Sequence, residues 1–466
     1  AAKKETKDSL ESVLLPVQFS CLRHVPWYKE TLAERYQRCL DLFAFPRIKR
    51  QKLQIADPDD LLPRLPPPRD LRPYPEILTM EYTGHQSAVR SLSVSPDGRW
   101  LATGCDDHIL RVFEIHTGRL IKQYDLRGTV NWVQFGPVLS CPYLVAAVEN
   151  EIVFFAASVA SLYRSHDKSD APKTKFDKMF SFEEVRNEPL KIFPEGEADT
   201  QSASINTFKQ TIPEDDLAKF TFPKESTNGL LLSVRIHAAV HTGSIHRSGD
   251  YVAVVAPDDA VRQRRVVLLN IETKKAICPF KLRSLCKDGT KVVGCTFFEH
   301  NTNFLVLTSA AAYIFDLKEQ SLLKKLRPGG TSLTAADVHP LSGNVICSAH
   351  SDAQRSVMLF EGDGEEKPVQ KFPAPFAGST ILSVSFHRKA SKYPLLALGD
   401  TSGHTSIFNV RSLMDDEILD TKASIIPLRN LRCESQAATT AAAFHPLLPW
   451  AFTASAKGEV LAWVEL

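Results

Sequence analysis

Short segments in which hydrophobic and polar residues alternate recur along most of the chain from residue 84 onward. The first copy reads GHQSAVRSLSVSPDGRWLATGCDDHILRVFEI, residues 84–115. In it, Val89, Leu92 and Val94 are interleaved with polar residues, and a Pro-Asp-Gly turn separates this segment from the next apolar one. Alternation of period two, bounded by turn residues, is typical of β-strands packed on one face. The pattern therefore predicts three consecutive strands here.

The same pattern returns six more times. Each copy has an apolar residue at the end of its first strand, and these residues are Val94, Phe135, Ile245, Phe297, Val338, Phe386 and Phe444. A repeat of about 40–45 residues with four short strands is the signature of a WD-type propeller blade. The sequence predicts an all-β fold, a seven-bladed WD40-type β-propeller over residues 76–466. An insertion over residues 156–230, between the second and third blades, accounts for the long interval between Phe135 and Ile245.

The ends of the predicted ring need a closing strand. The last copy supplies only three strands before the chain reaches Leu466, whereas residues 77–82 (ILTMEY) precede the first blade without another partner. We expect residues 77–82 to complete the seventh blade, because a closed ring leaves no exposed sheet edges.

The first blade carries the residues of a WD-type signature. Gly84 and His85 occupy the Gly-His position, Phe113 stands at the Trp position, and Asp107 lies where such repeats place a tight-turn aspartate. His85, Thr103 and Asp107 could form a buried hydrogen-bond chain, although Phe113 has no indole N–H to complete it. We interpret these residues as structural.

Residues 1–75 lack the repeat and form a predicted N-terminal arm. Thr31 and Glu34 match a capping box, which predicts a helix near residues 31–45. Its apolar stripe consists of Leu32, Tyr36, Cys39, Leu40 and Phe43. A helix this short is marginal in water, so we expect the stripe to dock either on the propeller or on a partner protein.

A basic cluster and a proline-rich strap follow the helix, over residues 46–75. Such a segment favours an extended, polyproline-like conformation. It is either a solvated face or a contact for RNA, since neutralising phosphates requires only positive charge. The candidate RNA-binding residues, with a second cluster in the third blade, are Arg47, Lys49, Arg50, Lys52, Arg64, Arg69, Arg72, Arg262, Arg264 and Arg265.

Charge and cysteine content exclude several classes of protein. The 56 basic and 54 acidic residues give a net charge of +2, which rules out a uniformly basic RNA coat. Residues 1–75 alone carry 14 basic and 10 acidic residues. The nine cysteines include no pair separated by two residues, so neither a zinc ribbon nor a disulfide framework is indicated. No signal peptide or long apolar span is present, and we expect a protein of the cytoplasm or nucleus.

The sequence carries no recognisable catalytic motif. Nucleophile elbows, phosphate-binding glycine loops and HExxH metal motifs are absent. The histidines that follow strands, His339, His387 and His445, lie near turns and are interpreted as structural. We therefore predict a protein that is not an enzyme and has no cofactor, no metal and no small-molecule substrate.

Three segments carry a family resemblance: LRHVPWYKETLAERYQRCLDLFAFPR (22–47), DPDDLLPRLPPPRDLRPYP (57–75) and FHPLLPWAFTASAKGEVLAW (444–463). They resemble the block-of-proliferation (BOP), or eukaryotic ribosome biogenesis (ERB), family. The resemblance implies a nucleolar or nucleoplasmic assembly factor of the large (60S) ribosomal subunit. It implies pre-rRNA processing in a complex with pescadillo and a second WD-repeat protein, on pre-60S particles containing precursor rRNA. It also assigns partner and RNA contacts to the helix and strap.

The alternative function is a generic WD-repeat adaptor that reads peptides, in a ubiquitin ligase or a chromatin complex. It requires the same propeller but gives the N-terminal arm no role.

Overall fold

The computed structural model places two units along the chain, residues 1–65 and 66–466. Residues 67–75, which the sequence places in the arm, lie in the same compact unit as the propeller. The structure describes residues 18–44 and 67–465, except for 139–141, 157–217, 223–228, 237, 257–265, 279–289, 330–331, 351–354, 363–365, 377, 411–424 and 434. Within these ranges, no helix has the length and apolar character needed to cross a membrane.

The described part of the first unit is helical. A 3₁₀ turn, η1 (Leu22–His24), precedes the helix α2 (Tyr28–Ala44). The helix begins before Thr31, and the Thr31 hydroxyl donates backward to the carbonyl oxygens of Trp27 (2.9 Å) and Tyr28 (3.1 Å). The predicted capping box is therefore wrong. A threonine inside the first turn bonds to carbonyls of the preceding turn instead of capping free N–H groups.

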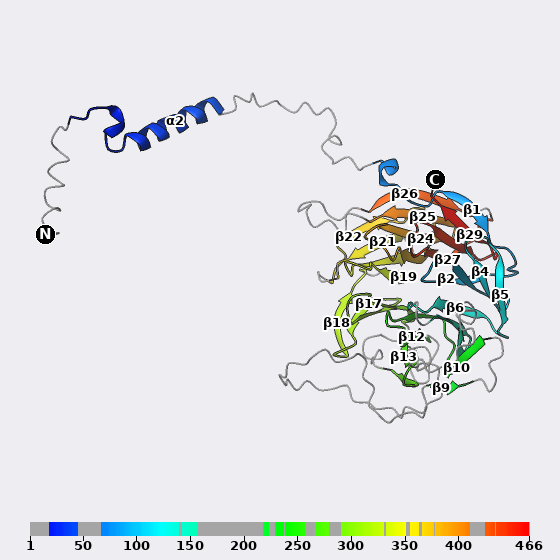
Figure 1. Ribbon diagram of the computed structural model, residues 1–466. Coiled ribbons are helices and arrows are strands. Elements are labelled where there is room, and N and C mark those ends of the chain that lie inside the picture. The colour runs from blue at the N-terminus through cyan, green and yellow to red at the C-terminus, as the bar shows by residue number, and fades with distance from the viewer. Residues whose placement is uncertain are drawn as a thin grey trace, which may run out of the picture. The chain divides into compact units, whose positions relative to one another are not determined.

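The second unit is a seven-bladed β-propeller whose strands form seven antiparallel sheets (Figure 1). Five blades hold four consecutive strands each. Blade 1 has β2 (Val89–Val94), β3 (Trp100–Cys105), β4 (Ile109–Glu114) and β5 (Leu120–Asp125). Blade 3 has β11 (Thr242–Ile245), β12 (Tyr251–Val255), β13 (Val266–Asn270) and β14 (Lys275–Ile277). Blade 4 has β15 (Val292–Phe297), β16 (Asn303–Thr308), β17 (Ala312–Asp316) and β18 (Ser321–Leu326).

Blades 5 and 6 repeat this arrangement. Blade 5 has β19 (Ser332–Val338), β20 (Val345–His350), β21 (Arg355–Phe360) and β22 (Gln370–Pro373). Blade 6 has β23 (Ile381–Phe386), β24 (Leu395–Asp400), β25 (His404–Asn409) and β26 (Ile426–Arg432). The prediction of a seven-bladed WD40-type propeller with a partly helical arm is confirmed.

Blade 7 is built from both ends of this unit. Its strands are β27 (Thr439–Phe444), β28 (Ala451–Ser455), β29 (Val460–Val464) and, outermost, β1 (Ile77–Glu81). Ile77 pairs with Val464 across the antiparallel β1–β29 ladder, which lies at the upper right of Figure 1. Tyr82 follows β1, is almost fully buried, and donates its hydroxyl to the Ile115 carbonyl at 2.9 Å. Blade 7 therefore closes the ring onto blade 1.

Blade 2 holds the long insertion, and the predicted position of the insertion between blades is wrong. The sheet order is β6 (Val130–Phe135), β7 (Tyr143–Val148), β8 (Glu151–Ala156), β10 (Leu230–Ile236) and β9 (Ala218–Thr221). The insertion thus separates the third and fourth strands of one blade. Its last part returns as β9 on the outer edge of β10, where Ser233 pairs with Thr221. Edge strands accept an additional strand because their outer N–H and C=O groups are unpaired.

The hydrophobic core lies between neighbouring blades. One cluster, for example, brings Ala102 and Leu110 of blade 1 against Val133 and Leu144 of blade 2. All six residues of β7 are buried, because both faces of this sheet pack against other blades. Packing sheets face to face in this way fixes the inner strands around a common axis.

Candidate interaction surfaces

The apolar stripe of α2 is exposed over its whole length. Leu32, Tyr36, Leu40 and Phe43 lie on it, and Phe43 is 90% exposed. Within the described residues 18–44, no helix side chain is buried. The predicted stripe is therefore present as a surface, and none of the described residues 18–44 covers it. A contiguous exposed apolar surface is characteristic of a protein-binding site.

The end of the strap is anchored to the propeller. A short 3₁₀ turn, η3 (Pro68–Leu71), leads to Tyr74, which is buried among Tyr393, Leu428 and other residues of blades 6 and 7. The guanidinium of Arg72 pairs with Glu76 at 3.3 Å, and the other oxygen of Glu76 pairs with Arg429 at 3.2 Å.

Two of the candidate RNA-binding residues can be placed. The charge of Arg72 is shared with Glu76, whereas Arg69 is exposed and makes no ion pair with a described residue. The remaining candidates lie outside the described residues, and they are Arg47, Lys49, Arg50, Lys52, Arg64, Arg262, Arg264 and Arg265.

The signature residues of blade 1 form a polar network around a buried arginine. Thr103 Oγ1 lies 3.4 Å from His85 Nε2, while Arg111 Nη1 lies 3.1 Å from His85 Nδ1 and 2.7 Å from Asp107 Oδ2. His85 also packs against the ring of Phe113. Burial, reinforced by the charge of Arg111, lowers the pKa of His85 to about 4. The imidazole is therefore neutral and acts as an acceptor at Nδ1.

Arg111 is the member of this network that the sequence analysis missed. Its side chain is only 4% exposed and bridges His85 to Asp107, which do not bond directly. The available signal was an arginine in the middle of the apolar strand β4. Gly84, the first residue of the signature, has a φ of +114°, a conformation that favours glycine.

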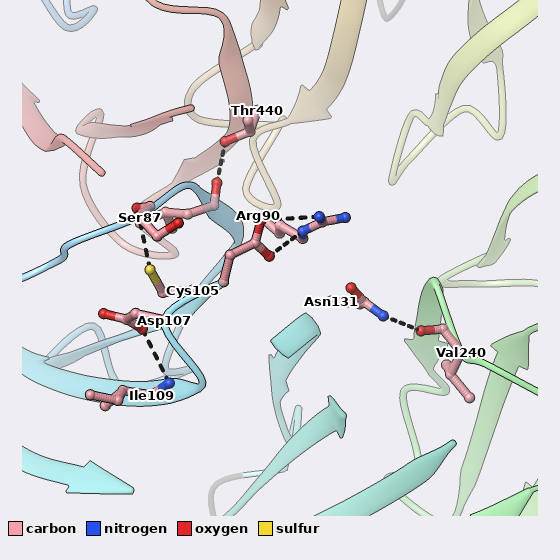
Figure 2. Close-up of polar contacts among 10 residues, drawn as sticks. Ser87, Arg90, Cys105, Asp107, Ile109, Asn131, Val240 and Thr440 are labelled. Carbon is pink, nitrogen blue, oxygen red and sulfur yellow. Dashed lines mark hydrogen bonds and ion pairs between the residues drawn. The ribbon is translucent and has the colours of Figure 1, made fainter. Parts of the chain in front are cut away.

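The same residues approach the spacing of a metal site but do not fit one. Ligand atoms of His85, Cys105 and Asp107 lie within 4.8 Å of one another. However, the cationic Arg111 already neutralises Asp107, and the Cys105 thiol donates to the Ser87 carbonyl at 3.3 Å. Figure 2 shows Cys105 pointing toward Ser87 and Asp107 toward the backbone of Ile109. Burial raises the pKa of Cys105, which opposes the thiolate that a metal requires.

Polar side chains also join neighbouring blades. Ser93 Oγ accepts a bond from the Phe135 N–H at 3.0 Å. Asn131 donates to the Val240 carbonyl at 2.9 Å, as Figure 2 shows, and Thr440 donates to the Val89 carbonyl. These contacts link blades 1 and 2, blades 2 and 3, and blades 7 and 1.

Two of the turn histidines perform the same linking role. His387 Nε2 donates to the Leu448 carbonyl at 3.0 Å, and His445 Nε2 donates to the Gly98 carbonyl at 2.9 Å. Both are fully or almost fully buried. Each histidine thus connects the turn after one inner strand to the corresponding turn of the next blade.

Comparison with known proteins finds two matching domain families. The BOP1NT (NUC169) domain matches residues 1–75, and the WD domain, G-beta repeat, matches residues 76–114. The chain is 34% identical, over 97% of its length, to a ribosome biogenesis protein BOP1 homolog of Leishmania infantum, covering 55% of that protein. It is 31% identical to the Oryza sativa subsp. japonica homolog of the same name, over 96% of this chain and 59% of that protein.

A vertebrate relative is more distant. The chain is 29% identical to ribosome biogenesis protein bop1-A of Xenopus laevis, over 96% of this chain and 55% of that protein. The chain thus spans somewhat more than half the length of the curated relatives it matches.

Proposed function

The chain belongs to the block-of-proliferation (BOP), or eukaryotic ribosome biogenesis (ERB), family, and on that premise we propose that it is a ribosome biogenesis factor. Its role is that of a non-enzymatic scaffold for the large (60S) subunit, in the nucleolus and nucleoplasm. The single observation that carries the proposal is the combination, in one chain, of the BOP1NT domain over residues 1–75 and a WD-repeat propeller. A generic WD adaptor requires only the propeller.

The proposed partners are a pescadillo-type protein, a second WD-repeat protein and precursor rRNA. The exposed stripe of Leu32, Tyr36, Leu40 and Phe43 supports a protein partner for α2, because four large apolar groups on one helix face are costly to leave in water. Arg69 and the basic residues before it are the proposed RNA contacts, through phosphate neutralisation.

Substitutions on the two faces of α2 test the partner proposal. In the full chain, Leu32→Gln with Tyr36→Gln removes apolar contacts, whereas Glu30→Gln with Asp41→Gln changes the opposite face of the helix. We expect the first pair to lose co-sedimentation with pre-60S particles and to lose recovery of the pescadillo-type protein by affinity capture. The second pair should behave as wild type.

Depletion of the protein tests the function itself. We expect unprocessed large-subunit rRNA to accumulate, with rescue by the wild-type chain and not by the apolar-face variant. Normal processing after depletion, or a capture dominated by ubiquitin-ligase subunits, would contradict the proposal.

A further inference from the structure

One ring position of the propeller differs in blade 5. The next-to-last residue of each inner strand occupies equivalent places around the axis, and these residues are Ser93, Gln134, Ser244, Thr296, Asp337, Ser385 and Ala443. Asp337 is the sole carboxylate in the seven described inner strands. The other six blades have an uncharged residue at this position, so the carboxylate of blade 5 calls for a specific explanation.

In blade 1, an uncharged side chain at this position makes the same hydrogen bond to the next blade. Asp337 Oδ2 accepts the N–H of Phe386 in blade 6 at 2.8 Å, and Oδ1 accepts the N–H of Val338 at 2.9 Å. The hydroxyl of Ser93 accepts the equivalent N–H in blade 2 at 3.0 Å. A serine would thus be sufficient to join blades 5 and 6, and the carboxylate charge of Asp337 exceeds what this bond requires.

Asp337 lines a cavity at one mouth of the central channel. The cavity has a volume of about 440 Å³, and inner strands of blades 2 to 6 contribute to its wall. Asp337 also lines a second cavity of about 320 Å³, to which inner strands of blades 3 to 7 contribute. Phe298 and Pro340 provide apolar wall, while Arg247, Glu299 and Arg388 stand exposed at the rim.

Among the described residues, the Asp337 carboxylate has no cationic partner in contact. Its hydrogen bonds are to two backbone N–H groups, while Arg247 donates to the Glu299 carbonyl at 3.2 Å. Arg90, the sole basic residue of the inner strands, is by contrast paired with Asp106. Burial is the main cause that raises the pKa of Asp337 to about 6, with the nearby Glu299 adding to it and Arg388 opposing it. A cation beside this carboxylate would offset the cost of burying it.

We propose that this mouth binds the arginine side chain of an extended peptide segment from a partner protein. Each Asp337 oxygen accepts one backbone bond and keeps a lone pair, so the pair of oxygens suits the two parallel N–H donors of a guanidinium. The apolar stem of the arginine would pack along Phe298 and Pro340. The site is independent of α2 and of the BOP1NT region.

Binding of a defined peptide to the full chain tests the proposal. The probe is a fluorescent heptapeptide with one central arginine among glycines and serines, and the matched control probe carries citrulline, which has the same shape without charge. We expect saturable binding of the arginine peptide at millimolar concentration or tighter, and about tenfold weaker binding of the citrulline peptide.

The decisive variant is Asp337→Ser. Its hydroxyl should still accept the Phe386 N–H, just as the hydroxyl of Ser93 accepts the Phe135 N–H. We expect it to fold with an unchanged circular dichroism spectrum and to bind the arginine peptide about tenfold less tightly. Asp106→Ser removes a carboxylate at Arg90 and should bind as wild type.

Three results would overturn the proposal. They are equal binding of the two peptides, full binding by Asp337→Ser, or no binding of the arginine peptide at millimolar concentration. Inorganic phosphate that binds this mouth and requires Arg247 or Arg388 would indicate an RNA contact instead and would equally overturn it. Because the assay uses purified protein and no ribosomal particle, its failure leaves the proposed role in ribosome biogenesis intact.

Discussion

At the scale of single residues, buried neutral histidines hold adjacent blades together. His387 donates at Nε2 to Leu448 and accepts the Lys389 N–H at Nδ1 (3.0 Å), so both ring nitrogens are used only in the neutral tautomer. Burial lowers the pKa of His387 to about 4. His339 is also fully buried, with its pKa lowered by burial to about 4. Protonating His387 in place would put a hydrogen on Nδ1 and remove the acceptor of the Lys389 N–H, while the Nε2–H donated to Leu448 would remain.

This linkage predicts a loss of stability in mild acid. An unfolded histidine has a pKa of about 6.5. Between pH 6.5 and 4, His387 is therefore protonated in the unfolded chain but neutral in the folded protein. The stability is fully present above pH 6.5 and is lost as the pH falls, by about 2 kcal/mol at pH 5 for one such histidine.

Urea denaturation between pH 7.5 and 5 measures this effect. His387→Gln should be less stable than wild type at pH 7.5 but show a shallower decline of the free energy of unfolding toward pH 5. His300→Gln, on an exposed turn, should keep the wild-type slope. Identical slopes for all three proteins would contradict the assignment.

Single residues could be predicted from the sequence where the repeat signature assigns them a place in the blade. They could not be predicted where their contacts depend on how the blades pack. Gly84, His85, Asp107 and Phe113 do lie together, because the signature fixes their places in one blade. The role of Arg111 was missed because an arginine in a strand is normally expected to face solvent. Only the fold shows that its strand is buried on both faces.

At the scale of elements, blade 2 shows how an insertion can be accommodated within a sheet. Strands β8 and β10 are adjacent, and Leu230 pairs with Phe155 next to the point where the chain leaves the sheet. The predicted insertion, residues 156–230, ends where β10 begins, and the alternating pattern did not identify β10 as the fourth strand of blade 2. Outer strands are half-exposed and lack a regular pattern, as the mixed burial of β10 shows.

The pairing of β8 with β10 predicts that the insertion can be shortened. Replacing residues 157–228 by a short Gly-Ser linker should leave a folded propeller, because the two strand ends already stand side by side. We expect the melting temperature to fall by only a few degrees, from the loss of partly buried Phe220 and Phe222.

Thermal denaturation and size-exclusion chromatography of the shortened protein measure this outcome. Phe220→Ser in the full chain serves as the matched control for the loss of β9 packing. A shortened protein that aggregates, while Phe220→Ser stays folded, would show that the insertion itself is required for folding.

At the scale of the whole molecule, the ring is closed by a strand that precedes all the repeats. β1 completes blade 7, and Tyr82 inserts next to Phe113 and Phe452 of the neighbouring blades. Closure was predictable from counting strands, because the last blade has only three strands of its own and needs a fourth strand from elsewhere in the chain. The anchoring of residues 67–76 was not predictable, since it depends on a pocket in the packed blades that receives Tyr74.

Two truncations test the importance of closure. A chain of residues 67–466 keeps β1 and Tyr74 and should melt close to the wild-type temperature. A chain of residues 83–466 exposes the edge of β29 and loses buried Tyr82, and we expect a melting temperature lower by more than about 10 °C. A synthetic peptide of residues 67–82 should restore part of this loss, and equal melting of both chains would contradict the role of β1.

The pairing of Ile77 with Val464 also determines when the propeller can form during synthesis. Strand β1 leaves the translating ribosome before every blade, yet its partner β29 is made after all the other strands of the ring. Until then, Tyr82 and the outer edge of the nascent ring remain unpaired, and exposed strand edges promote aggregation. Premature termination anywhere before β29 therefore yields an open ring, so the propeller can close only once β29 has been made.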